Sequence, residues 1–366
     1  MSVVFLIPGP LRTFTNGRRE VSVEGSFSTL RDAFAALFLM HPGLRDRILT
    51  EQGEIRQHVN VFVGNDCVRY GIGLATQIPN GAEISVIPAI TGGSPDAAAA
   101  RNGQPLLEAV NLRKSFAASS GPWGSSVQRT AAVDDVSLFV ERGETLGIVG
   151  ESGCGKTTLA RMLLRLIEPD SGEIRFRGED WLGARGAKLR QLRRRMQMVF
   201  QDPVASLNPR MRVGTIVGEP LAIHEPALAR EERRARAAEI LQAVGMGADA
   251  LGRYPHEFSG GQRQRIGIAR ALILRPELVI ADEPVSALDV SIGAQILELL
   301  ARLQREMSLT LVLISHSLPV VAQLANRIAV MRAGRIVEIG EAGQVLCSPR
   351  EDYTKALIAA VPQIPA

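Results

Sequence analysis

The chain has 366 residues, 46% of them hydrophobic, with 35 glycines and 20 prolines. Such a composition excludes a disordered or fibrous chain, and the length leaves room for two or three domains. The net charge of +4 comes from basic residues spread along the whole sequence, so it does not indicate a nucleic-acid partner.

No stretch of the sequence is suited to crossing a membrane. No apolar run approaches the roughly 20 residues that a spanning helix needs. The first residues, MSVVFLIPGPLR, lack the basic-then-apolar order of a secretory signal. The densest basic cluster, Arg190 with Arg193, Arg194 and Arg195, is typical of a solvated helix face. We therefore expect a cytoplasmic protein that reaches any membrane only through a partner.

The first 93 residues predict a small α+β domain. Apolar and polar residues alternate over 2–8 and 19–25, as in the two strands of a hairpin. The segment 28–40 changes to helical spacing, with Ser28 or Thr29 as its N-terminal cap. Two further strands, rich in β-branched residues, follow at 59–64 and 83–90. This order suits one sheet packed on one helix.

The next segment, 94–104, is rich in small and polar residues and has no periodicity, so we interpret it as a linker. From 105 to 366, strand patterns alternate with helical ones, which indicates an α/β domain with a mostly parallel sheet. The predicted organisation is a domain over 1–93, a linker over 94–104 and a domain over 105–366.

A glycine-rich loop between a strand and a helix carries the strongest chemical signal. The sequence ETLGIVGESGCGKTTLARML contains the pattern G-x-x-x-x-G-K-T. Glycines let such a loop curl so that its N–H groups point at phosphate oxygens, and the following helix adds positive charge. Lys156 would hold the β and γ phosphates, Thr157 would offer its hydroxyl to Mg²⁺, and Cys154 fills a free position. The predicted phosphate-binding residues are Gly150, Glu151, Ser152, Gly153, Cys154, Gly155, Lys156, Thr157 and Thr158.

Two acidic residues follow a second apolar strand. Residues 278–281 form the kind of continuous apolar run that is buried on both faces of a sheet, and Asp282 and Glu283 come after it. Asp282 can hold the Mg²⁺ shell, and Glu283 can orient and polarise an attacking water. Joined to the phosphate loop, this acidic pair is a strong signal.

A second glycine-led helix begins near Ser259. The segment EFSGGQRQRIGIARALIL starts with Ser259, Gly260 and Gly261 and continues with apolar residues at helical intervals. Taken alone, the segment is explained by an ordinary serine-capped helix. Its meaning therefore depends on the motifs around it.

Together these motifs resemble those of the nucleotide-binding subunits of ABC transporters. The matching segments, in the expected order, are Walker A at 150–157, the Q-loop at Gln201, the signature FSGGQ at 258–262, Walker B at 278–282, the D-loop SALD at 286–289 and the switch histidine at His316. The resemblance covers about residues 105–362.

The resemblance implies the P-loop NTPase fold of an ABC nucleotide-binding domain, with a helical subdomain near 202–255 that contacts a permease. It implies ATP and Mg²⁺ as ligands. The implied catalytic residues are Glu283, His316 and Gln201, and the implied Mg²⁺ site is Thr157, Gln201 and Asp282. Ser259, Gly260, Gly261 and Gln262 would contact the ATP held by a second subunit.

The resemblance also implies partners and a location. The partners are a second ABC ATPase subunit, either a paralogue or another copy, two membrane permease subunits and an external solute-binding protein, with no nucleic acid. The chain would lie on the inner face of the cell membrane, held there by the permease subunits.

Three stretches narrow the resemblance to importers of oligopeptides and dipeptides, and they lie at 206–221, 253–272 and 348–362. Nickel and glutathione importers share these stretches, so the cargo stays open. The chain departs from the family at Ser317, where Asp is usual, and at Glu351 and Asp352, where His and Pro are common. Neither departure removes a group that hydrolysis needs.

One aromatic residue has two interpretations. Phe116 in NLRKSF resembles the side chain that stacks on adenine in the family, but core packing explains it equally well.

The first 93 residues resemble a different family, the ubiquitin-like sulfur carriers of β-grasp fold, such as the small subunit of molybdopterin synthase. The matching segments are IPGPLRTFTNG, HVNVFVGNDCVRY and VIPAITGG. Such carriers use a free terminal glycine carboxylate, whereas here Gly93 is followed by Ser94. The domain is then either a passive or regulatory appendage or a carrier released by proteolysis after Gly93.

A soluble ABC ATPase without a transport role is a further alternative for the chain. The single nucleotide domain and the importer-like tail favour transport.

Overall fold

The computed structural model describes the protein over 2–7, 9–25, 27–50, 52–56, 59–64, 66–68, 73–79, 81–88, 104–118 and 128–360. Its Cα atoms divide into two compact units, 1–91 with 341–355 and 92–340 with 356–366. The domain boundaries expected from the sequence, 1–93 and 105–366, stay a prediction. The expected linker, 94–104, lies outside the described residues except at Gln104. Each unit has its own hydrophobic core.

The first unit contains a five-stranded sheet in the order β2-β1-β5-β3-β4. Its strands are β1 (Ser2–Leu6), β2 (Glu20–Glu24), β3 (Val59–Val63), β4 (Asp66–Cys67) and β5 (Glu83–Pro88). The first two strands pair antiparallel, as the sequence predicts, with the 3-10 helix η1 (Gly9–Thr15) between them. β1 also pairs in parallel with β5, which brings the last strand to the middle of the sheet.

One helix, α1 (Leu30–Met40), packs against this sheet. Of its two predicted caps the structure selects Thr29, whose hydroxyl accepts from the N–H of Asp32 while the Asp32 carboxylate accepts from the N–H of Thr29 at 3.0 Å. The buried ring of Phe34 lies 5.4 Å from that of Phe5 in β1. The predicted sheet packed on one helix is confirmed. Shorter elements are η2 (Pro42–Leu44), α2 (Arg45–Ile48) and η4 (Gly73–Ala75).

The second unit contains two sheets, one in the order β11-β12-β13-β8-β14-β15 and one in the order β10-β9-β6-β7. The strands of the first are β8 (Thr145–Val149), β11 (Met196–Val199), β12 (Leu278–Asp282), β13 (Thr310–Ser315), β14 (Arg327–Arg332) and β15 (Arg335–Glu341). Those of the second are β6 (Leu107–Ala118), β7 (Gln128–Val140), β9 (Ser171–Phe176) and β10 (Glu179–Asp180), all antiparallel. Five strands of the first sheet pair in parallel, which confirms the mostly parallel sheet expected from the sequence.

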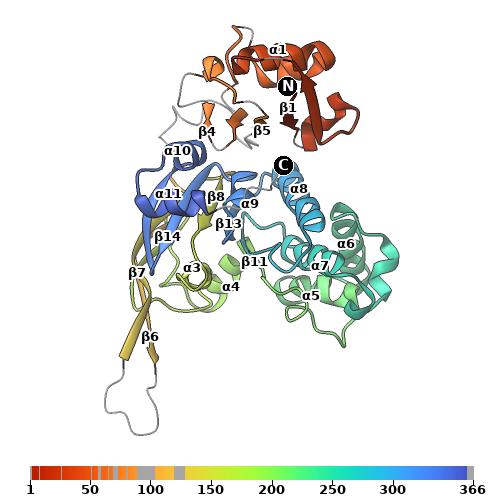
Figure 1. Cartoon of the computed structure of the whole chain (residues 1–366). Coiled ribbons are helices and arrows are strands. Elements are labelled where there is room, and N and C mark those ends of the chain that lie inside the picture. The colour runs from red at the N-terminus through yellow and green to blue at the C-terminus, as the bar shows by residue number, and fades with distance from the viewer. Residues whose placement is uncertain are drawn as a thin grey trace. The chain divides into compact units, whose positions relative to one another are not determined.

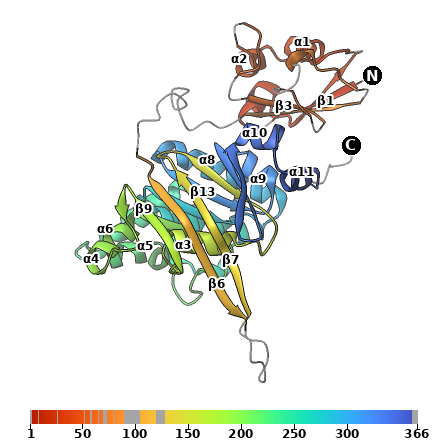
Figure 2. The same cartoon turned by 90° about the vertical axis from the view of Figure 1, so that its left-hand side faces the viewer.

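The three central strands, β8, β12 and β13, are buried at every residue. Such strands read as continuous apolar runs because layers cover both faces of the sheet. One covering element is α3 (Lys156–Leu163), which contacts both β12 and β7 and lies between the two sheets (Figure 2). Trp181 fixes the end of α3, since its fully buried indole donates Nε1–H to the carbonyl oxygen of Leu163 at 2.9 Å.

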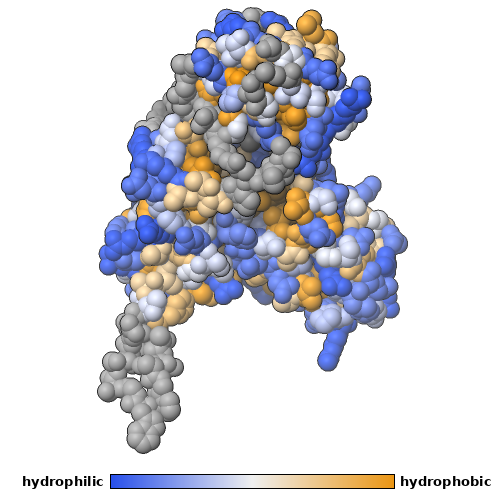
Figure 3. Space-filling view, viewed as in Figure 1, coloured by the Kyte–Doolittle hydropathy of each residue, from blue (hydrophilic) through white to orange (hydrophobic). Residues whose placement is uncertain are grey.

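Three helices form a subdomain beside the parallel sheet (Figure 1). They are α5 (Val213–His224), α6 (Arg230–Ala243) and α7 (Gly260–Leu272), and the first two lie within the expected range 202–255. α6 buries only Ala237 and Leu241, so the face it presents is mostly hydrophilic (Figure 3). The other helices are α4 (Gly186–Arg195), α8 (Val290–Met307), α9 (Leu318–Ala322), α10 (Ala342–Cys347) and α11 (Asp352–Ala359), with the 3-10 helices η6 (Ala248–Gly252) and η7 (Pro255–Glu257).

No helix among the described residues combines the length and the apolar character needed to span a bilayer.

The register of the parallel sheet brings four loops to one edge. Val149 of β8 lies opposite Ser315 of β13, Ile314 lies opposite Asp282 of β12, and Ala281 lies opposite Val199 of β11. The carboxyl ends of these strands are therefore level. Ligands of open α/β sheets bind at this edge, where the loops that follow the strands meet.

Candidate active site

The glycine-rich loop after β8 has a backbone that side chains would obstruct. Gly150, Gly153 and Gly155 have φ angles of 154°, 80° and 108°. A Cβ atom on Gly150 would lie 2.1 Å from the carbonyl oxygen of Met331, and one on Gly155 would lie 2.0 Å from that of Ala132. Gly153 has open space around it and needs only the backbone conformation. The glycine spacing is thus required by the shape of the loop.

Lys156 lies inside this loop at the start of α3. Its Nζ donates to the carbonyl oxygens of Gly150 and Glu151 at 2.7 and 2.8 Å, and the side chain is buried. The N-cap residue of the helix, Gly155, has no side chain that could accept from the first N–H groups of α3. A buried ammonium beside uncapped helical N–H groups is suited to a phosphate. Ser152 is exposed beside it, and Thr158 is partly buried in the first turn of α3.

Cys154 is buried within the same loop, with Sγ 3.7 Å from Lys156 Nζ. Burial raises the pKa of this thiol above its ordinary value, against the opposing effect of the nearby ammonium. The thiol therefore stays protonated at neutral pH and is a poor nucleophile. This agrees with the interpretation of Cys154 as a filler of a free motif position.

We expect Lys156→Ala to weaken ATP binding by about 10- to 100-fold, because a charge-assisted hydrogen bond contributes about 1.5–3 kcal/mol. Titration of the full-length chain with a fluorescent ATP analogue measures this affinity. Lys188→Ala is the matched control, since Lys188 pairs with Glu179 on the surface of the same unit. Equal affinities for the two variants would contradict the role of Lys156.

Asp282 ends β12 directly opposite the second residue of α3. Its Oδ1 accepts a hydrogen bond from Thr157 Oγ1 at 3.2 Å, and the residue is 2% exposed. Burial raises the pKa of this carboxyl, and the Thr157 hydroxyl opposes the shift. A buried carboxylate beside a hydroxyl is an all-oxygen donor set, which is the set that Mg²⁺ prefers. These two residues therefore suit a magnesium ion.

Glu283 stands at the centre of the residues that the sequence predicts as catalytic. Its Oε2 lies 3.1 Å from Gln201 Nε2, which donates to it, and 3.2 Å from His316 Nδ1. Glu283 has a φ of 46°, a conformation that L-residues other than Asn and Asp adopt rarely and that is common at functional sites. Three loops thus bring Gln201, Glu283 and His316 together.

The signature segment begins α7. Ser259 caps the helix, and its N–H donates to Gln262 Oε1 at 3.0 Å, so the serine-capped helix expected from the sequence is present. Ser259 and Gly260 are exposed, whereas Gly261 is buried where a Cβ would lie 2.5 Å from Cγ2 of Ile292 in α8. Gly261 is therefore needed for packing, and the two residues before it are open to a ligand.

Phe116 lies on β6 and is 42% exposed, with Lys114 Nζ 5.9 Å from the centre of its ring. This exposure favours the stacking interpretation over core packing. An exposed ring at the surface is available for stacking on a nucleotide base.

The geometry agrees with what known proteins show. Residues 133–286 match the ABC transporter family. The probable peptide ABC transporter ATP-binding protein of Sinorhizobium fredii is 52% identical over 257 residues, which are 70% of this chain and 72% of that protein. The oligopeptide transport ATP-binding protein of Salmonella typhimurium is 50% identical over 259 residues, 70% of this chain and 78% of that protein. This chain belongs to the ABC transporter family.

Membership in this family makes the chain an ATP-binding protein and an ATP hydrolase. A solved bacterial ABC transporter cassette, described as dimeric, is 30% identical and aligns with a TM-score of 0.57 over 64% of this chain and 98% of that chain. The post-hydrolysis state of a cassette bound to ADP and Pi aligns with the same TM-score, identity and coverage. The P-loop NTPase fold expected from the resemblance is therefore confirmed.

The N-terminal residues of this ABC protein match a second family. Residues 5–93 match the ThiS family. The fusion that the sequence predicts, of a ubiquitin-like domain to an ABC ATPase domain, is therefore confirmed. Gly92 and Gly93 lie outside the described residues.

Sequence reasoning missed the turn that supports the phosphate loop of the ABC domain. The N–H of Gly334, between β14 and β15, donates to the carbonyl oxygen of Cys154 at 2.9 Å, and Met331 packs against Gly150. Ala333 and Gly334 both have positive φ angles, typical of a tight hairpin turn. The sequence Ala-Gly signals such a turn, but no local pattern predicts which loop it contacts.

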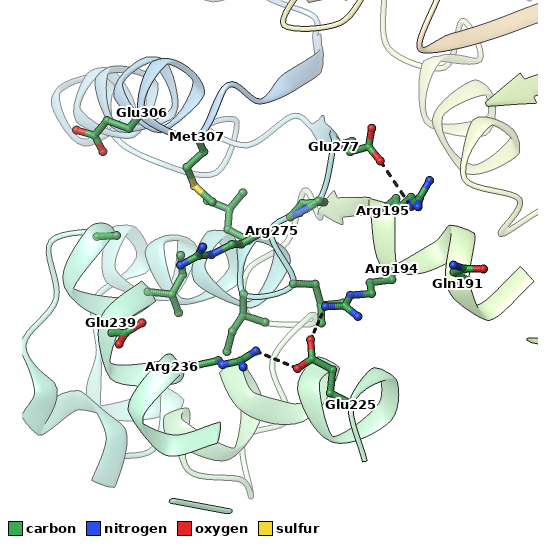
Figure 4. Close-up of a pocket in the computed structure, with 16 residues that line it drawn as sticks. Gln191, Arg194, Arg195, Glu225, Arg236, Glu239, Arg275, Glu277, Glu306 and Met307 are labelled. Atoms are coloured by element: carbon green, nitrogen blue, oxygen red, sulfur yellow. Dashed lines mark hydrogen bonds and ion pairs between the residues drawn. The ribbon is translucent and has the colours of Figure 1, made fainter. Parts of the chain in front are cut away.

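A cavity of about 1010 Å³ lies away from the catalytic edge of this ABC domain. Arg195 and Glu277, which line it, directly precede β11 and β12, so it opens at the opposite ends of these strands. Figure 4 shows the Glu225 carboxylate between the guanidinium groups of Arg194 and Arg236, at 2.5 and 2.9 Å. The side chains of the predicted arginine cluster are thus partly solvated and partly paired. The Arg194–Glu225 pair joins α4 to the helical subdomain, and the Arg236–Glu225 pair lies within that subdomain.

Proposed function

We propose that this chain is the ATP-hydrolysing subunit of an importer and that it powers uptake of oligopeptides or dipeptides through separate permease subunits. The observation that carries the proposal is an identity of 52% and 50%, over 70% of this chain, to two peptide-transport ATP-binding proteins. The dipeptide transport ATP-binding protein of Haemophilus influenzae, 47% identical over 260 residues, supports the same cargo class.

Each residue of the site has a proposed task. Lys156 and the N–H groups of the glycine-rich loop bind the phosphates of ATP, and Phe116 stacks on the base. Thr157, Asp282 and Gln201 would hold Mg²⁺, which neutralises charge on the phosphates when bound. Glu283 holds the attacking water, and its carboxylate is oriented by Gln201 and His316.

The signature residues act on the ATP of a second subunit. Ser259 and Gly260 are exposed at the N-terminus of α7, where an arriving phosphate would meet free N–H groups. Hydrolysis then requires a dimer with one ATP between the phosphate loop of one subunit and the signature of the other. The second subunit is either a paralogue or another copy of this chain.

Permease subunits require a docking surface on the nucleotide domain. Exposed apolar side chains that suit this purpose are Leu166 after α3, Val204 in the loop after β11 and Ile223 on α5, which are 53%, 57% and 47% exposed. Docking would hold the chain on the inner face of the cell membrane, with a solute-binding protein delivering cargo from outside.

Reconstitution in lipid vesicles tests this function. Vesicles that contain the full-length chain, its permeases and its solute-binding protein should take up labelled short peptides. This uptake should require ATP on the side of the membrane where the ATPase subunit lies. Labelled Ni²⁺ and glutathione are the competing cargoes. ATPase activity without co-purifying permeases would support the alternative of a soluble, non-transport ABC ATPase instead.

The match of residues 5–93 to the ThiS family favours a second candidate function for the N-terminal domain. Proteolysis after Gly93 would free a glycine carboxylate and release a sulfur carrier from the ATPase. Intact mass spectrometry of the chain from native cells tests this, because release predicts a fragment that ends at Gly93. A single full-length species would leave the domain as an appendage of the importer.

A further inference from the structure

Arg270 joins two parts of the active site that are far apart in sequence. It lies on α7, and its Nη1 donates to the carbonyl oxygen of Ser206 at 2.5 Å. Its guanidinium also lies 5.7 Å from the centre of the Phe200 ring. Phe200 and Ser206 flank Gln201, so one side chain holds the Gln201 loop on both sides.

The loop between these two contacts is itself ordered by hydrogen bonds. Asp202 Oδ1 accepts from the N–H groups of Val204 and Ala205 at 2.7 and 3.1 Å. The N–H of Ser206 donates to the carbonyl oxygen of Asp202 at 3.1 Å. Because the turn 202–206 is closed on itself, fixing Ser206 also limits the movement of Gln201, which directly precedes the turn.

The same helix carries the signature residues at its other end. Ser259 caps α7 and Arg270 lies in its last turn. They are eleven positions apart in the sequence, which is about 16 Å along a rigid helix. Gln201 touches the catalytic Glu283, and Ser259 faces the ATP of the second subunit in the proposed dimer. Arg270 is therefore the link between the catalytic carboxylate and the signature helix.

We propose that Arg270 is a positioning residue that fixes the Gln201 loop to the signature helix, so that Gln201 and the signature serine move together during the ATP cycle. This proposal rests on the proposed function for its role in the cycle. The loop ordering itself does not depend on transport and is measurable in the isolated chain.

The surroundings of Arg270 explain why arginine is needed. The guanidinium is half-buried, and burial lowers its pKa while Glu219 of α5 opposes this shift. Arginine keeps its charge under such burial, and its planar group stacks on a ring while donating in its own plane. Lysine offers a point charge without a stacking plane, so Arg270→Lys removes the geometry and retains the charge.

Hydrogen exchange of the nucleotide-free, full-length chain tests the ordering. Arg270→Lys should speed exchange of the 200–207 amides by at least about fivefold, with exchange of α3 unchanged. Arg265→Lys is the matched control, because Arg265 lies on the same helix but donates to Val244 within the helical subdomain. Unchanged exchange at 200–207 in Arg270→Lys would overturn the proposal.

A double-mutant cycle tests whether Arg270 acts through Gln201. The kcat of ATP hydrolysis is measured in the transporter complex for Gln201→Ala, Arg270→Lys and the double variant. If Arg270 acts only by placing Gln201, the double variant has the kcat of Gln201→Ala within about twofold. If the fold-decreases in kcat of the two single variants multiplied in the double variant, Arg270 would not act through Gln201. The control pair, Gln201→Ala with Arg265→Lys, should give independent effects.

A second variant covers the case in which Arg270→Lys folds poorly. Phe200→Leu removes the stacking partner from a side chain that is 39% exposed, so it leaves the core intact. It should speed exchange at 200–207 in the same direction as Arg270→Lys, and the KM for ATP should stay unchanged because the phosphate loop is untouched. A raised KM with unchanged exchange would count against the proposal.

Discussion

Glu283→Gln is expected to lower the kcat of ATP hydrolysis by about 10²- to 10⁴-fold, the usual contribution of a general base. The replacement keeps the shape of the side chain, and its carbonyl oxygen can still accept from Gln201 Nε2. It removes the charge that polarises the attacking water. ATP binding should persist because Lys156 and the glycine-rich loop are unchanged, so the variant should accumulate as an ATP-bound closed dimer.

Two measurements distinguish a specific loss of catalysis in Glu283→Gln from a general loss of folding. Steady-state hydrolysis gives kcat, and light scattering with Mg²⁺ and ATP gives the fraction of dimer. Glu298→Gln is the matched control, since Glu298 is an exposed residue of α8 and should retain the wild-type rate. If Glu283→Gln hydrolysed ATP at the wild-type rate, Glu283 would not be the residue that orients the water.

The parts of the site that could be predicted are those that depend only on residues close together in the sequence. The glycines of the phosphate loop, the cap at Ser259 and the acidic pair that ends β12 each depend on neighbouring residues, and the structure has all three. The sequence also predicts that these loops lie at the same edge of the sheet. Parallel strands that are buried on both faces bring the loops that follow them to one edge.

The missing parts depend on contacts between distant segments. The hydrogen bond from Gly334 to Cys154 joins a turn and a loop that share no sequence pattern. The contacts of Arg270 with Phe200 and Ser206 bridge more than sixty residues. The helical spacing of the apolar residues predicts that Arg270 lies on a helix, but it does not predict which residues its side chain contacts. Local cues also left two caps possible for α1, and the hydrogen bonds of Thr29 and Asp32 select one of them.

Asp282→Asn is expected to have opposite effects on stability and activity. Burial raises the pKa of Asp282, so its ionised form opposes folding. The group's contribution to stability is fully present below its unfolded pKa and is lost as the pH rises through the raised folded value. At pH 7.5 the nucleotide-free Asp282→Asn chain should therefore melt higher by roughly 2–4 °C, the shift that about 1 kcal/mol produces. This difference should shrink as the pH falls toward 4, the ordinary pKa of an aspartate.

The rate of ATP hydrolysis by Asp282→Asn should fall, in contrast to the rise in its melting temperature. Without the Asp282 carboxylate the chain loses the charged ligand that suits Mg²⁺, so kcat should fall by about 100-fold or more and added MgATP should stabilise the variant less than the wild type. Differential scanning fluorimetry at several pH values, with and without MgATP, measures both effects. Asp249→Asn is the control, because its exposed carboxylate lies on η6 and its loss should leave the melting temperature and kcat unchanged. A lower melting temperature for nucleotide-free Asp282→Asn would mean that the carboxylate stabilises the fold, and a wild-type kcat in this variant would contradict the magnesium role.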